Sequence, residues 1–306
     1  MLRRMERTVC GTLVSAVLLC VFFCFAGCNK IIDIAGEQSG AGTDASSGEP
    51  SEVLSYRVEE MHVENGENDI YGRLYVPKEG EDRMPAVILS HSANLTADSM
   101  NAYAVGFAER GYVAYAFDFC GGSANSRSDG STGDMTLFTE IADLKAVLSG
   151  ISELDCVDSA RIYLFGTSQG GLVTALTAEE IPESVKGQIL LYPAWNIPEL
   201  VSRFSGFDFP SFGSFGSYGK AFRESLADYD VYAHIGGFEG NVLILHGSGD
   251  FIVNPSYSER ASGLYGHCTL RIIEGAGHGF NSENFSMYGD YDSEVWQYID
   301  AYFAAE

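Results

Sequence analysis

The stretch Arg161-Ile-Tyr-Leu-Phe-Gly-Thr-Ser-Gln-Gly-Gly171 decides the fold of this chain. Residues 162–165 are apolar and β-prone, residues 166–170 fit Gly-x-Ser-x-Gly, and residues 172–178 are compatible with a helix. In a strand–turn–helix unit of this kind the serine is held in a strained backbone conformation, and the glycines let strand and helix pass without a Cβ clash. Ser168 is therefore the candidate nucleophile, at a helix N-terminus that can stabilise an oxyanion. The alternative is an ordinary glycine-rich turn with a surface serine.

Composition sets the broad class of the protein. The chain has 306 residues, of which 46% are hydrophobic and 12% aromatic, enough for one large α/β domain or two small ones. The net charge of −24 argues against nucleic acid as a partner, because phosphate binding needs clusters of Lys and Arg and the sequence shows none. The acidity predicts a solvated surface.

Cysteine spacing predicts neither a disulfide framework nor a metal site. Four of the seven cysteines fall in an apolar N-terminal segment and three in the body of the chain: Cys10, Cys20, Cys24, Cys28, Cys120, Cys156 and Cys268. No Cys-x-x-Cys pair occurs, and no cluster of His and Asp has ligand spacing, so we expect no metal and no cofactor. One disulfide within the body and free buried thiols both remain open.

The N-terminus reads as an export signal over residues 1–28. A basic start with three arginines precedes an apolar run from Val9 to Ala26. The run ends in Phe25-Ala26-Gly27-Cys28, which resembles the lipobox of bacterial lipoproteins and implies lipidation of Cys28. An uncleaved membrane anchor is the alternative. Both predict a membrane-tethered, extracytoplasmic protein, with residues 29–55 as a flexible Gly/Ser-rich tether.

Apolar periodicity predicts an α/β domain over residues 56–306. An antiparallel hairpin over 56–63 and 70–76 comes first. The buried strands are expected at 85–90, 112–117, 162–165, 188–192, 242–245 and 269–273, and the helices at 99–110, 137–148, 172–178, 256–264 and 291–303. This alternation indicates a mostly parallel central sheet with helices on both faces.

A segment at about 193–240 interrupts this alternation between two strands, where a cap over an active site would be inserted. Its phenylalanines stand among Gly, Ser and Pro: Phe204, Phe207, Phe209, Phe212 and Phe215. They suggest an apolar substrate pocket, and packing of the insertion onto the domain would use them equally well.

Two further residues complete a constellation for acyl transfer. Asp250 and His278 each follow an apolar strand by a few Gly-rich residues, so both belong to the edge where the carboxyl ends of parallel strands meet. A serine nucleophile needs such a base and such an acid. The oxyanion donors are expected to be the backbone N–H groups of Gln169 and Ala93.

Two other histidines also end strands. His91 and His246 precede the positions expected for the base. They are interpreted as structural loop residues that hydrogen-bond to backbone.

The whole body resembles an α/β-hydrolase, and within that superfamily it resembles bacterial cinnamoyl and feruloyl esterases. The resemblance is carried by Ser90-His-Ser-Ala-Asn, Ser128-Asp-Gly, Thr136-Leu-Phe138, Gly166-Thr-Ser-Gln-Gly-Gly171, Leu191-Tyr-Pro-Ala-Trp-Asn-Ile-Pro-Glu199, His246-Gly-Ser-Gly-Asp250 and Gly277-His-Gly279. It implies a triad of Ser168, Asp250 and His278 in the family's chain order. The chain departs from the family at residues 91–93, where the family reads His-Gly-aromatic, and at 120–122, where it reads Gly-His-Gly.

These observations predict a serine hydrolase that cleaves carboxylic esters through an acyl-enzyme, with cinnamoyl, feruloyl or short-chain acyl groups as candidates. A serine peptidase or acyl-aminoacyl hydrolase of the same fold is the first alternative, because it would use the same triad. A non-catalytic, membrane-tethered binding lipoprotein is the second.

Overall fold

The computed structural model describes residues 55–203, 219–280 and 290–306. The predicted signal segment with Cys28, all but the last residue of the predicted tether, and the five phenylalanines of the predicted cap lie outside these residues. No helix in the described part of the chain is both long enough and apolar enough to span a membrane.

Strands and helices alternate as the periodicity predicts. The strands are β1 Tyr56–Asn65, β2 Asn68–Pro77, β3 Met84–Ser90, β4 Val113–Phe117, β5 Val157–Thr167, β6 Gly187–Leu191, β7 Asn241–Gly247 and β8 Cys268–Ile273. The helices are η1 Ala97–Met100, α2 Asn101–Ala108, α3 Leu137–Ser152, α4 Gln169–Glu180, η2 Pro182–Ser184, α5 Ile197–Arg203, α6 Lys220–Ser225, η4 Val231–Ala233, α7 Ser256–Ser262 and α9 Asp292–Ala304. The helix expected at 99–110 is split, because its first turn is the 3-10 helix η1.

All eight strands form one sheet in the order β1-β2-β4-β3-β5-β6-β7-β8. The predicted hairpin of β1 and β2 is confirmed, and its two-residue turn places Gly66 at a φ of 65°. Strand β2 is also antiparallel to β4, and every pair from β4 to β8 is parallel. The sheet is therefore mostly parallel, as predicted.

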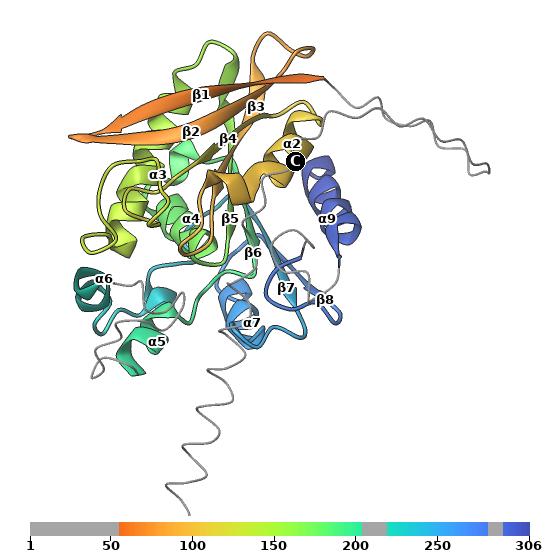
Figure 1. Cartoon of the computed structure of the whole chain (residues 1–306). Helices are drawn as coiled ribbons and strands as arrows, with labels where there is room; N and C mark the ends of the chain where they lie inside the picture. The colour runs from red at the N-terminus through yellow and green to blue at the C-terminus, as the bar shows by residue number, and fades with distance from the viewer. Residues whose placement is uncertain (1–54, 204–218, 281–289) are drawn as a thin grey trace, which may run out of the picture.

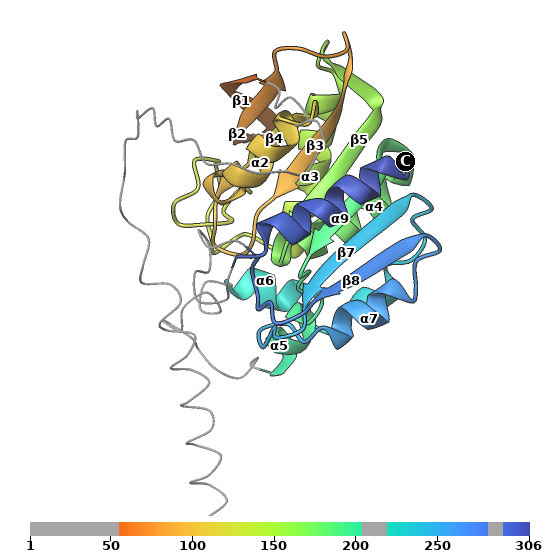
Figure 2. The ribbon, with the colours of Figure 1, turned by 90° about the vertical axis from the view of Figure 1, so that its right-hand side faces the viewer.

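Helices cover both faces of the sheet (Figures 1 and 2). Along β3, Ala86 and Ile88 belong to the core that includes α3 and α4, whereas Val87 and Leu89 belong to the core that includes α2 and α9. Successive side chains of a strand point to opposite faces. A strand buried on both faces must be apolar throughout, which explains the unbroken apolar run of β3.

The direction of the chain reverses beside β3. It leaves β3 through α2 to β4 on one side, then returns through α3 on the other face of the sheet to β5 on the opposite side of β3. The loops that follow β3 and β5 therefore diverge at the same edge, starting from the paired residues Ser90 and Gly166. In open α/β sheets such a switch point opens a crevice for ligands.

Helix α4 begins very close to this edge. A Cβ added at Gly166 would lie 2.3 Å from the carbonyl oxygen of Gly170, and one added at Gly170 would lie 2.2 Å from the carbonyl oxygen of Ser90. No side chain fits at either position without moving backbone, so the two motif glycines allow α4 to approach β3 and β5.

The predicted cap position, residues 193–240, falls between β6 and β7. Its described parts form α5, α6 and η4, and α5 and α6 lie together beyond the end of β6 (Figure 1).

Replacing Gly170 with Ala is expected to lower the free energy of unfolding by about 2 kcal/mol, because the new methyl group meets fixed backbone carbonyls. Gly266→Ala is the matched control, since a Cβ there has nothing within 4 Å. Urea unfolding of both variants measures the difference. Equal stability of the two would contradict this account of the close approach.

Candidate active site

Ser168 occupies a strained turn between β5 and α4. Its φ of 51° lies in the left-handed region that residues other than glycine rarely adopt. Its N–H donates to the carbonyl of Leu191 at 3.0 Å, and its own carbonyl accepts from the N–H of Ala194 at 2.9 Å. The end of β6 and the residues after it therefore hold the strained conformation from the side.

His278 lies in the loop after β8 and reaches Ser168. Its Nε2 is 2.9 Å from Ser168 Oγ. The ring of Tyr192 meets the imidazole edge to face, with 4.8 Å between ring centroids. Tyr192 itself has a φ of 40°, so the chain takes a second strained conformation where it supports His278. Nothing in the sequence pattern around Tyr192 predicts this contact.

Asp250 lies in the loop after β7 and contacts the far side of the same imidazole. Its Oδ2 is 2.7 Å from His278 Nδ1, and its Oδ1 accepts from the N–H groups of Ile252 and Val253, both at 2.9 Å. Burial alone raises the pKa of Asp250, but hydrogen bonds from His246 and His278 outweigh it and hold that pKa below its ordinary value. The group is a carboxylate at neutral pH.

These contacts determine how protons are placed along the three side chains. A carboxylate only accepts hydrogen bonds, so His278 must donate to Asp250 from Nδ1. The neutral ring then has an unprotonated Nε2 facing the hydroxyl of Ser168. This is the arrangement in which a histidine can take a proton from a serine. The three predicted residues are therefore brought together.

The loop after β3 is tied to the end of β5. Ser92 Oγ is 2.9 Å from Thr167 Oγ1, one residue before the serine. His91 accepts from the N–H of Phe119 at Nε2 and donates from Nδ1 to the carbonyl of Ser92. Burial lowers the pKa of His91, which keeps the ring neutral. Its predicted structural role is confirmed, and it sets the conformation of the segment that carries Ala93.

Gln169, the first residue of α4, has a buried partner that the sequence analysis missed. Its side-chain Nε2 donates to both carboxyl oxygens of Glu140 on α3, at 2.8 and 2.7 Å. Burial is the main cause that raises the pKa of Glu140 to about 8, and nearby Asp143 adds to it. These two hydrogen bonds tie the start of α4 to α3.

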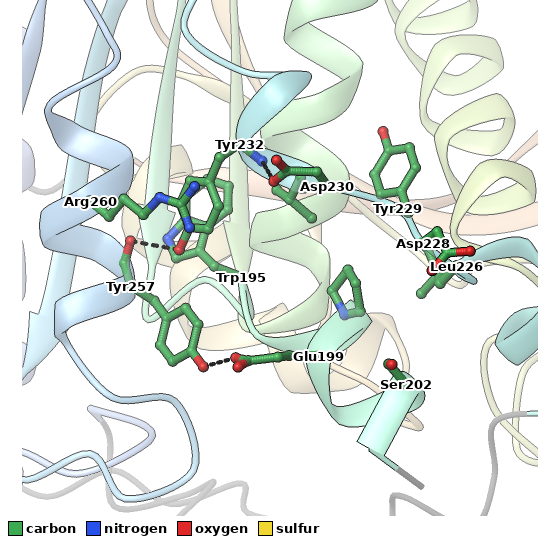
Figure 3. A pocket seen from close by; sticks show the side chains of 12 residues that line it. Trp195, Glu199, Ser202, Leu226, Asp228, Tyr229, Asp230, Tyr232, Tyr257 and Arg260 are labelled. Carbon is green, nitrogen blue, oxygen red and sulfur yellow. Dashed lines mark hydrogen bonds between the residues drawn. The ribbon is translucent and has the colours of Figure 1, made fainter. Parts of the chain in front are cut away.

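A cavity of about 450 Å³ lies among α5, η4 and α7 (Figure 3). Trp195 and Tyr232 supply aromatic walls, and Arg260 lies over the Tyr232 ring at 3.7 Å from its centroid. Glu199 accepts a hydrogen bond from the hydroxyl of Tyr257 at the rim. Ser168, Asp250 and His278 are not among the residues that line this cavity.

The cysteines of the body are free thiols: Cys120, Cys156 and Cys268. Their spacing left open either one disulfide or free thiols, and the structure shows free thiols at these three positions. Within the described ranges, no three His, Cys, Asp or Glu side chains are grouped so that they could hold a metal ion.

The fold of this chain matches that of solved structures. The similarity is strong to Est1E from Butyrivibrio proteoclasticus with ferulic acid bound: TM-score 0.67, 24% identity, covering 80% of this chain and 98% of that one. A second structure is GrgF, an alpha/beta hydrolase from Penicillium. It matches with a TM-score of 0.61 and 19% identity, and the match covers 81% of this chain and 97% of GrgF. This chain has the α/β-hydrolase fold. The fold resembles that of Est1E, as the motifs predict.

Sequence comparisons agree with this fold. The family model described as "Serine aminopeptidase, S33" matches residues 82–215, which is less than half of the chain. An uncharacterised 31.7 kDa protein from the traX-finO intergenic region of Escherichia coli is 31% identical over 94 residues, or 30% of this chain. The match spans only 32% of that relative's length.

The buried Glu140 predicts a pH-dependent stability. Its pKa of about 8 when folded exceeds the ordinary value of ~4.3, so the unfolded chain loses this proton first and stability falls as pH rises from about 4.5 to 8. Glu140→Gln removes that penalty. The variant should gain roughly 4 kcal/mol relative to the wild type between pH 4.5 and pH 9.

Urea unfolding at several pH values measures the gain. Glu153→Gln, at the exposed end of the same helix, is the control and should give a curve parallel to the wild type. A Glu140→Gln curve that is also parallel to the wild type would refute the raised pKa.

Proposed function

We propose that this α/β-hydrolase is a serine esterase that cleaves carboxylic esters through an acyl-enzyme. The observation that carries the proposal is the continuous chain from Ser168 Oγ to His278 to Asp250, with separations of 2.9 and 2.7 Å. The left-handed φ of Ser168 supports it, because natural sequences keep such strain where it presents a functional group.

The chemistry follows from the proton placement. Ser168 Oγ attacks the ester carbonyl carbon while His278 Nε2 takes the hydroxyl proton. Backbone N–H groups of Gln169 and Ala93 stabilise the oxyanion of the tetrahedral intermediate. The bond to the leaving alcohol breaks as His278 returns the proton to that oxygen. Water then attacks the acyl-enzyme while His278 Nε2 takes a proton from it. His278 returns this proton to Ser168 Oγ as the acyl–Oγ bond breaks, which releases the carboxylic acid and restores the serine.

We propose cinnamoyl, feruloyl or short-chain acyl esters as substrates. Ferulic acid is the ligand held by Est1E, a protein of this fold. The loop at residues 91–93 has Ser92 and Ala93 in place of glycine and an aromatic residue, so the space beside the oxyanion differs in shape from that of the family. This difference is the reason to include short acyl groups.

We also propose an extracytoplasmic, membrane-anchored lipoprotein of a bacterial cell. The support is the apolar segment that ends at Cys28, preceded by three arginines and followed by a Gly/Ser-rich tether.

A serine peptidase is the second candidate, favoured by the description of the matching family model. An aminopeptidase needs a carboxylate near the nucleophile to hold the substrate ammonium group. Glu140 and Asp250, the buried carboxyl groups that adjoin the turn, already accept hydrogen bonds from Gln169 and from two histidines. This favours the esterase.

Ser168→Ala is expected to lower the turnover of p-nitrophenyl acetate by at least about 10⁴-fold, because the nucleophile is lost. Ser159→Ala, an exposed serine at the start of the same strand, should keep wild-type turnover. The release of p-nitrophenolate measures both. Activity of Ser168→Ala equal to the wild type would sink the serine mechanism.

Parallel assays separate ester from peptide hydrolysis. We expect kcat/KM for p-nitrophenyl acetate and methyl ferulate to exceed that for aminoacyl p-nitroanilides by about a hundredfold or more, because Glu140 and Asp250, the buried carboxyl groups at the turn within the described residues, already have partners. The reverse order would favour the peptidase. No turnover of any of them, with no fluorophosphonate labelling, would favour a non-catalytic binding protein.

A further inference from the structure

Asp250 is held by two histidines. The Nε2 atom of His246, on β7, lies 3.1 Å from Asp250 Oδ2, the same oxygen that lies 2.7 Å from His278 Nδ1. The side chains of His246 and Asp250 are completely buried. With the two backbone N–H groups on Oδ1, the carboxylate accepts four hydrogen bonds. A buried carboxylate in this network has no room to rotate.

The protonation of His246 can be worked out from its neighbours. Nε2 faces Asp250 Oδ2 and, at 2.9 Å, the carbonyl of Val253, and both are acceptors, so Nε2 must carry a proton. Nδ1 is 2.7 Å from Ser258 Oγ on α7. That oxygen also accepts from the indole Nε1 of Trp195 at 3.1 Å, since an indole N–H can only donate.

The result is a directed chain of hydrogen bonds. Trp195 donates to Ser258. In the tautomer with its proton on Nε2, His246 accepts from the Ser258 hydroxyl at Nδ1, and its Nε2–H is shared between the carbonyl of Val253 at 2.9 Å and Asp250 Oδ2 at 3.1 Å. Every polar atom in this chain is satisfied, although all four side chains are buried. Trp195 is also a wall of the cavity in Figure 3. The chain therefore runs from the cavity to the acid that orients His278.

We propose that His246 is a positioning residue of the esterase, and that Ser258 and Trp195 hold it in the required tautomer. His246 fixes Asp250 Oδ2 where it accepts from His278 Nδ1, and so fixes the direction of His278 Nε2 toward Ser168. The role rests on the proposed function. The hydrogen bond to the carbonyl of Val253 confirms the structural role expected from the sequence. The positioning role goes beyond it, because a bond to backbone alone would not require a donor beside the carboxylate that holds the base.

Variants of the full chain test this role with p-nitrophenyl acetate. His246→Leu should lower kcat by about 10- to 100-fold with KM within about twofold of the wild type. His246→Gln, whose amide can reach toward Asp250, should recover a large part of that loss. Ser258→Ala should lower kcat by about three- to tenfold. Ser256→Ala, an exposed serine on the same helix, is the matched control and should match the wild type.

A second readout needs no turnover. The proton on His278 Nδ1 should give a low-field ¹H NMR signal, assigned by its loss in His278→Gln. Ser258→Ala and His246→Leu should shift or broaden this signal, whereas Ser256→Ala should leave it unchanged. A wild type without esterase activity would refute the proposed function, yet the NMR signal would still report whether His246 orders the Asp250–His278 pair.

Wild-type kcat and an unchanged low-field signal in folded His246→Leu would overturn the proposal. If His246→Leu does not fold, Ser258→Ala decides: wild-type kcat together with an unchanged signal would overturn it. Equal loss of kcat in His246→Leu and His246→Gln, with the signal unchanged in both, would assign His246 to packing and would also overturn it.

Discussion

The approach of α4 to the ends of β3 and β5 is the contact on which the rest of the site depends. Without side chains at Gly166 and Gly170 the helix can start within van der Waals distance of the backbone after β3. The turn between strand and helix is then so short that Ser168 is forced to a φ of 51°. The cost of that strain is on the order of 1–3 kcal/mol, and the surrounding hydrogen bonds must outweigh it.

The topology of the sheet brings the other groups to the same edge. The loops after β3, β5, β7 and β8 supply the Ala93 segment, Ser168, Asp250 and His278 in turn. Separate contacts hold the groups that these loops carry. Ser92 is tied to Thr167, Tyr192 supports the imidazole of His278, and backbone N–H groups hold one oxygen of Asp250. These contacts hold side chains from several loops together at one edge of the sheet.

Two buried acidic groups lie close to the turn and behave in opposite ways. Asp250 accepts from two histidines and two backbone N–H groups, and its pKa is lowered. Glu140 has one amide as its partner, and burial raises its pKa to about 8. The difference follows from the number of donor groups, because both side chains are removed from solvent. In the proposed mechanism an ionised acid is needed only at Asp250, where it stabilises the imidazolium of His278.

Local pattern was enough to predict the strands, the turn and the three residues of the proposed triad. The motif at 166–170 needs only its own strand and helix, and Asp250 and His278 are marked by the strands that precede them. Burial of Glu140 could not be predicted, because α3 shows its inward face only when α4 packs against it. The pairing of Trp195 with Ser258 joins segments 63 residues apart and leaves no local pattern. Strand β5 begins at Val157, earlier than its apolar core indicates, because residues 158–161 are half-exposed or exposed.

The most direct test of the central claim is to map where a fluorophosphonate binds covalently. The intact protein is labelled and digested, and the modified peptide is sequenced by mass spectrometry. We expect one adduct, on the oxygen of Ser168, and we expect it to form rapidly in the wild type. It should be lost in His278→Gln, because the glutamine side chain cannot take the serine proton. Labelling of a different serine, or equal labelling of Ser168 in the wild type and in His278→Gln, would contradict it.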